Sequence, residues 1–117
     1  MSDRRVGPII LSHPVAREQL LEHGAVVTFR KRDRTTGETW WRESRTGAKR
    51  GDCTVEKIEA VAFGETRQPL FDHVELSGFA SIGAWLAAIG ALHGGVPDRG
   101  WLFRVRAGNS LNGGASS

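Results

Sequence analysis

Apolar and polar residues alternate along several short segments of the chain, which is the pattern of strands that bury one face. Such runs predict strands at 8–11, 25–32, 53–63 and 100–106. Gly37 marks a turn, so residues 38–44 are expected to return beside 25–32 as the second strand of a hairpin. The pattern therefore indicates a sheet of four or five strands.

Two longer segments repeat their apolar residues every three to four positions and predict helices. The first begins at Pro14 and ends at Gly24, and the second has Ser81 as its N-cap and ends at Gly94. The apolar stripe of the second helix is expected to place Trp85 in the core.

The segment 64–76 follows neither period, and an irregular chain is expected there, with a short strand near Leu70 and Phe71. Strands and helices in this order predict an α+β domain. Its expected form is a small barrel-like sheet of about five strands, with two helices packed at its ends.

A chain of 117 residues is expected to form one domain, here residues 8–106. Residues 1–7 are expected to be loose, and 107–117, rich in Gly, Ser and Asn, to form a disordered tail. The single cysteine, Cys53, excludes an internal disulfide and fits a reducing compartment. The sequence shows no cationic leader and no apolar run of membrane length, so a cytoplasmic monomer without a membrane partner is expected.

The positive charge of the chain is concentrated in one segment. The net charge is only +3, but residues 30–52 hold eight of the sixteen basic residues and four acids, which gives +4 there and leaves −1 for the rest. Such a concentration is typical of a surface that binds a polyanion. The alternative is a solvated hairpin whose charges keep its edge from pairing with other chains.

Residues for metal or cofactor chemistry are scarce. The four histidines and one cysteine lack the spacing of metal ligands, and no glycine-rich phosphate loop is present, so neither a metal nor a cofactor is predicted. The sequence places no base beside Cys53, so a small buried thiol is expected. His23 and His93 precede glycines at helix ends, where histidine interacts favourably with the helix dipole.

Two adjacent tryptophans lie among the concentrated cations. Neighbours on a strand point to opposite faces, so one of Trp40 and Trp41 is expected in the core and the other outside among the arginines. Guanidinium groups pair with phosphates, and an exposed indole stacks on an unpaired base. The predicted nucleic-acid-binding residues are Arg30, Lys31, Arg32, Arg34, Trp40, Trp41, Arg42, Arg45, Lys49 and Arg50.

Several pieces of the chain, in their order, resemble the ASCH domain of the PUA-like superfamily. They are G-A-V-V-T-F-R (24–30), K-R-G-D (49–52), E-L-S-G-F-A-S-I-G-A-W-L (75–86) and G-W-L-F-R-V (100–105). The resemblance covers roughly residues 9–106. It implies a small β-barrel with helices at its ends, a cleft on one side and a function connected with RNA.

One ASCH branch is similar to small amidohydrolases that deacylate N4-acetylcytidine with a Lys, a Thr and a Glu. The resemblance places the Thr on Thr28 and the Glu on Glu75, which are the candidate catalytic residues. The Lys falls on Ala25, which cannot act as a base or a cation, and Lys31 lies six residues farther on, about 20 Å along an extended strand. This departure favours binding over catalysis.

The sequence therefore predicts a nucleic-acid-binding module. Its basic Arg/Trp hairpin, beside a PUA-like cleft, is expected to bind single-stranded or structured RNA in preference to duplex DNA. The first alternative is a nucleoside amidohydrolase or a ribonuclease that uses the cleft around Thr28 and Glu75. The second is an interaction domain in which Trp and Arg anchor an acidic protein partner.

Overall fold

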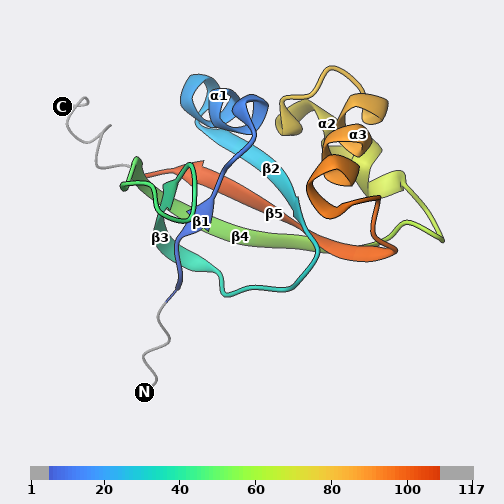
Figure 1. Ribbon diagram of the computed structural model, residues 1–117, viewed down its shortest axis with the longest axis horizontal. Coiled ribbons are helices and arrows are strands. Elements are labelled where there is room, and N and C mark those ends of the chain that lie inside the picture. Colours follow the sequence, from blue (N-terminus) through green and yellow to red (C-terminus); the bar gives the residue numbers. More distant parts are fainter. Residues whose placement is uncertain (1–5, 109–117) are drawn as a thin grey trace.

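A five-stranded sheet curls into a half-barrel in the computed structural model, and three helices pack against it (Figure 1). The structure describes residues 6–108. The predicted loose N-terminus and tail lie largely outside these residues, and Ala107 is the last residue of the final strand. The prediction of an α+β fold with a barrel-like sheet is confirmed, with three helices in place of two.

The strands are β1 (Ile9–Ile10), β2 (Ala25–Arg30), β3 (Gly37–Arg42), β4 (Gly51–Ala62) and β5 (Arg99–Ala107). Within the sheet they follow the order β1-β3-β4-β5-β2. β1 pairs in parallel with β3, and the other neighbours are antiparallel. The two edges of the sheet are therefore β1 and β2.

The predicted hairpin between 25–32 and 38–44 is wrong, because β2 pairs with β5 and β3 pairs with β4. Both faces of β2 are buried, since Val26 packs inside the half-barrel and Val27 packs beneath the helices α2 and α3. A strand with both faces covered cannot lie in a solvated hairpin, because such a hairpin leaves one face of each strand in water. Residues 31–36 form a connecting loop in place of a tight turn.

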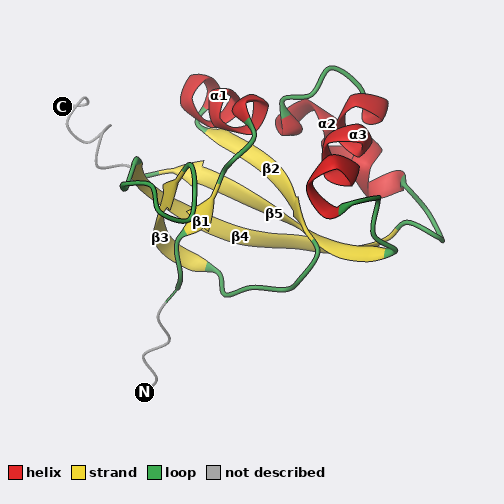
Figure 2. Ribbon diagram, viewed as in Figure 1, coloured by secondary structure: helices red, strands yellow, loops and turns green. Residues whose placement is uncertain are grey.

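The helices are α1 (Pro14–His23), α2 (Gln68–Ser77) and α3 (Ile82–His93). In Figure 2, α1 lies over one end of β2, and α2 and α3 lie together over the other end. Both predicted helices begin and end as expected. The Ser81 hydroxyl accepts a hydrogen bond from the backbone N–H of Ala84 at 3.1 Å, and left-handed glycines follow His23 and His93.

Helix α2 occupies the segment for which an irregular chain with a short strand was predicted, so that prediction is wrong. Its N-cap, Arg67, makes no capping hydrogen bond through its side chain, unlike the caps of α1 and α3. Two signals were present: Pro69 lies in the first turn, and Gly78 ends the helix with a φ of 87°.

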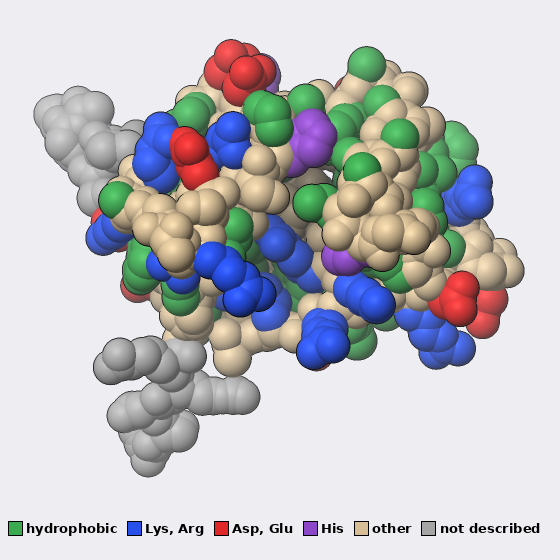
Figure 3. Space-filling view, viewed as in Figure 1, with side chains coloured by type: hydrophobic (Ala, Val, Ile, Leu, Met, Phe, Trp, Pro, Cys, Tyr) green, Lys and Arg blue, Asp and Glu red, His purple; other side chains and the backbone are tan. Residues whose placement is uncertain are grey.

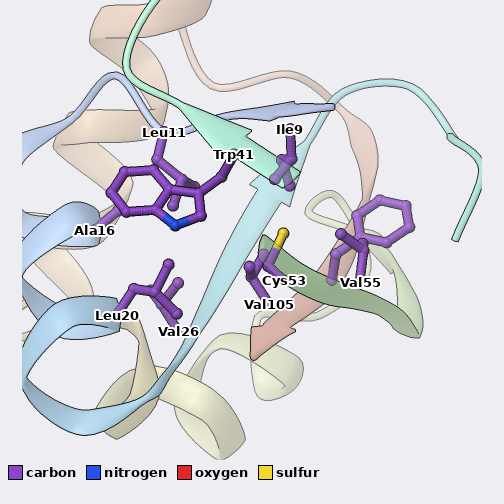
Figure 4. Close-up of a cluster of buried hydrophobic side chains, with 10 residues drawn as sticks. Ile9, Leu11, Ala16, Leu20, Val26, Trp41, Cys53, Val55 and Val105 are labelled. Atoms are coloured by element: carbon purple, nitrogen blue, oxygen red, sulfur yellow. The ribbon is translucent and has the colours of Figure 1, made fainter. Parts of the chain in front are cut away.

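The sheet separates two apolar cores. The first lies inside the half-barrel beneath α1 and contains Trp41, which packs near Ala16 and Leu20 of that helix (Figure 4). The second lies between the other side of β2 and the helices α2 and α3, and it contains Trp85 as predicted. Helical periodicity thus placed Trp85 correctly, and strand alternation predicted that one of Trp40 and Trp41 would be buried without saying which.

Gly100 allows β2 to approach β5 closely. An added Cβ at this position would overlap the ring of Phe29 and would lie 2.7 Å from the carbonyl oxygen of Arg30. The Phe29 ring itself contacts Phe63 and His93, with centroid separations of 5.3 and 5.9 Å. Gly100 therefore fixes how the end of β2 packs against α3.

We expect Gly100→Ala to lower the free energy of unfolding by about 1–3 kcal/mol, because the methyl group must displace the Phe29 ring or the β2 backbone. Urea denaturation followed by circular dichroism measures this. Gly64→Ala is the control, since nothing lies within 4 Å of an added Cβ there. Equal stability of the two variants would show that the close approach is not required.

Candidate functional site

A hollow lies where the edges β1 and β2 face each other without pairing, and it is here called the seam pocket. Its walls come from the β1–α1 connection, from β2 and from the helical segment 77–93. The space within it, including the open mouth, is about 520 Å³. Its polar and aromatic lining includes His13, Thr28, Arg30, Ser77, Phe79 and His93.

Arg30 spans the gap between the two sheet edges. Its Nη2 donates a hydrogen bond of 2.7 Å to the carbonyl oxygen of Ile10, whereas its Nε is buried without a partner. Burial, followed by the nearby cation of Arg34, lowers the pKa of the Arg30 guanidinium to about 10. Arg30 thus stays charged at neutral pH, although it has lost water and holds no carboxylate, which favours the arrival of an anion.

Thr28 lies two residues before Arg30 on the same face of β2 and also lines the seam pocket. The side chain is buried, and its Oγ1 has no hydrogen-bond partner. A buried hydroxyl without a partner typically costs about 1–3 kcal/mol. Two unpaired polar groups on one strand face therefore leave hydrogen-bonding capacity that a ligand could use.

His13 contributes a second polar group to the seam pocket as the N-cap of α1. Its Nδ1 accepts a hydrogen bond of 3.1 Å from the backbone N–H of Val15. In the neutral imidazole the proton then resides on Nε2, which can donate. The ring meets Phe79 edge to face, with the centroids 5.0 Å apart. This contact ties the β1–α1 connection to the segment after α2.

His93 lines the seam pocket from the last residue of α3. Its ring meets the Phe29 ring edge to face and is shielded from water on that side. This partial burial, followed by the charges of Lys31 and Arg30, lowers the pKa of the His93 imidazole below its ordinary value. An anion bound in the pocket would oppose the effect of both cations.

No Asp or Glu lines the seam pocket within residues 6–108, while one arginine and two histidines do. Figure 3 shows a hollow on this face with Lys and Arg side chains gathered along its lower rim. Cations act more strongly where apolar walls exclude water. The electrostatic character of the seam pocket therefore suits an anionic or electron-rich ligand.

The paired tryptophans have different environments, as predicted from their alternation. Trp41 is 3% exposed in the inner core, and Trp40 is half-buried on the other face of β3. The guanidinium of Arg42 lies 5.3 Å from the centre of the Trp40 ring, and its Nε is also buried without a partner. Neither indole lines the seam pocket, so Trp40 could stack on a base only beside it.

The predicted cations fall into three groups. Arg34 is used structurally, since it donates hydrogen bonds to the carbonyl oxygens of Gly7 and Pro8. Lys49 and Arg50 are paired with the carboxylates of Asp52 and Glu43. The third group of predicted cations makes no ion pair within the described part of the chain and consists of Arg30, Lys31, Arg32, Arg42 and Arg45.

The candidate catalytic residues are not brought together. Thr28 lines the seam pocket, but Glu75 is exposed on α2 and does not. Ala25 lies at the start of β2, opposite Arg106. Cys53 is buried as predicted, and burial raises the pKa of its thiol to about 11, which disfavours a nucleophilic thiolate.

Sequence reasoning missed several residues of the pocket. His93 was explained only by its place at a helix end. Ser77 and Phe79 appeared only within the stretch 75–86 that resembles the ASCH domain and were given no role. The one available signal for His13 was its position before Pro14, at a helix start that follows an edge strand.

We expect Thr28→Val to raise the free energy of unfolding by about 1 kcal/mol, because it replaces an unpaired buried hydroxyl with a methyl group of similar shape. Thermal and urea denaturation measure the change. Thr54→Val on β4 is the matched control and should change stability by less than about 0.5 kcal/mol. A loss of stability specific to Thr28→Val would mean that the hydroxyl already has a partner.

The comparisons with known proteins assign no family. No family model, no curated protein and no solved structure matches the chain significantly. No group of three or more His, Cys, Asp or Glu side chains suited to a metal ion occurs among residues 6–108. In the same range no single helix is long and apolar enough to cross a membrane, and α2 with α3 passes that test only as a pair bent by 91°.

Proposed function

We propose that the protein binds single-stranded RNA, with an unpaired nucleotide in the seam pocket and the neighbouring phosphates on the cations around it. The observation that carries the proposal is the pair of unsatisfied polar groups, Thr28 Oγ1 and Arg30 Nε, in a pocket whose described lining holds no carboxylate. Guanidinium groups bind phosphate and also stack on bases.

The lining of the seam pocket supports a flat ligand with an anionic end. Phe79 supplies aromatic surface beside the buried rings of Phe29 and Trp85, and Arg30 supplies the charge. A nucleotide combines a planar ring with a phosphate, so both halves of the pocket would be used.

The exposed face of β3 extends this surface. Arg42 lies opposite Ile10 in the register of β3 and β1, and the main chain of Ile10 accepts the hydrogen bond from Arg30. Trp40, two residues before Arg42 on the same face of β3, would stack on a base that leaves the pocket. The ASCH resemblance supports the same location, because it implies a cleft on one side of a PUA-like barrel.

The hydrolytic alternative has less support. A nucleoside amidohydrolase or ribonuclease of the ASCH type would use Thr28 with Glu75, and the carboxylate of Glu75 does not line the seam pocket. Thr28 Oγ1 makes no hydrogen bond to either histidine of the pocket, so it acts as a hydrogen-bonding group and not as an activated nucleophile. Binding therefore agrees better with the geometry than catalysis does.

We expect Arg30→Gln to weaken binding of a labelled single-stranded RNA by about 10- to 100-fold, because charged hydrogen bonds to phosphate are worth about 1.5–3 kcal/mol. Fluorescence anisotropy at several salt concentrations measures the affinity. The logarithm of the binding constant should fall with the logarithm of salt concentration, with a slope of about −0.7 per phosphate neutralised.

Arg67→Gln is the control for this experiment, because Arg67 is exposed at the start of α2 and lines none of the hollows that involve Arg30 or His93. A DNA single strand and a DNA duplex serve as competitors. Equal losses in the two variants, or tighter binding of the duplex, would contradict the proposal. Absence of binding by the wild type at low salt would redirect attention to acidic protein partners.

A further inference from the structure

A second hollow adjoins the seam pocket and is here called the loop hollow. It lies where the chain passes from α3 into β5, and it is lined by Lys31, His93, residues 94–97, Asp98 and Arg99. His93 lines both hollows, and Lys31 directly follows Arg30 in the chain. The two hollows are therefore neighbours that share the imidazole of His93 as a common wall.

The loop hollow carries cations that the fold does not use. Lys31 and Arg99 are exposed and make no ion pair within the part of the chain that the structure describes. The loop itself is held in place, because the backbone carbonyl of Asp98 accepts a hydrogen bond of 2.8 Å from the N–H of Phe63. A fixed loop thus presents two unpaired cations beside His93, against the single carboxylate of Asp98.

We propose that the loop hollow holds the phosphate next to the nucleotide in the seam pocket, so that the ligand is a single strand of at least two nucleotides. This inference rests on the proposed function. Arg30 contacts the nucleotide in the seam pocket, and Lys31 contacts the phosphate in the loop hollow. The strand passes over His93 between them. The arrangement distinguishes a polymer from a mononucleotide, which fills the seam pocket alone.

The protonation of His93 offers a second way to test this inference. The charged and titratable groups around its two hollows are Arg30, Lys31, Asp98, Arg99 and His13. In the free protein the pKa of His93 lies below its ordinary value. A phosphate beside the ring favours the imidazolium, so binding raises this pKa and takes up a proton. Affinity for the strand should therefore increase as the pH falls through the raised pKa.

The test compares a labelled uridine hexanucleotide with uridine 5′-monophosphate on the full chain. We expect the double variant Lys31→Gln/Arg99→Gln to bind the hexanucleotide about tenfold more weakly and with a salt slope about 0.7 smaller in magnitude, and to bind the monophosphate within about twofold of the wild type. The control is Arg67→Gln/Arg106→Gln, which removes two exposed cations that line neither hollow.

NMR titration of His93 provides the second readout, and the hexanucleotide should raise its pKa in the wild type but less in Lys31→Gln/Arg99→Gln. An unchanged affinity for the hexanucleotide in that variant, or an equal loss in the control, overturns the inference while leaving the proposed function standing. Parallel losses for the hexanucleotide and the monophosphate overturn it as well. A wild type that binds no hexanucleotide at low salt overturns the proposed function and this inference together.

Discussion

The hydrogen bond from Arg30 to the carbonyl oxygen of Ile10 connects two sheet edges that do not pair with each other. A closed barrel would satisfy those edges with a ladder of backbone hydrogen bonds. Here the sheet stops as a half-barrel, and the gap is spanned by one guanidinium and covered by the helices. The seam pocket exists because this closure is made by a side chain, and its polarity follows from the same arginine.

The polar groups that would bind a ligand lower the stability of the free protein. Arg30 and Thr28 each retain a buried polar atom without a partner, and burial lowers the pKa of the Arg30 guanidinium. Such groups cost free energy in the unliganded fold, and a ligand that supplied hydrogen-bond partners would recover that free energy. They lie on alternate residues of one edge strand, so this free-energy cost is concentrated at a single place, as is common at functional sites.

Local patterns in the sequence were sufficient for the helices α1 and α3 and for the alternation that separates Trp40 from Trp41. They failed where a position depends on distant partners. The apolar content of β2 identified a strand but not its neighbour, because both faces of β2 are covered by segments far away in the sequence. Helix α2 was missed because its start lacks the side-chain cap that α1 and α3 have.

The candidate site shows the same division. Thr28 was named through the ASCH resemblance and Arg30 as one of the concentrated cations, and alternation along β2 places both on the face opposite Val27. The histidines of the pocket were not assigned to it, since only the tertiary fold brings His13 at the start of α1 and His93 at the end of α3 to the same pocket. Glu75 was carried by resemblance alone, and a resemblance in sequence order does not fix which side of a helix faces a cleft.

NMR mapping of the surface that responds to RNA tests the central proposal, that the seam binds single-stranded RNA, most directly. Backbone amide shifts of the labelled protein would be followed during titration with a single-stranded uridine oligonucleotide. The account predicts that the largest changes fall on β2 at Thr28 and Arg30, on His13 and on the end of α3. Changes confined to the segment 43–50, which holds the other basic residues, would show that the seam is not the site.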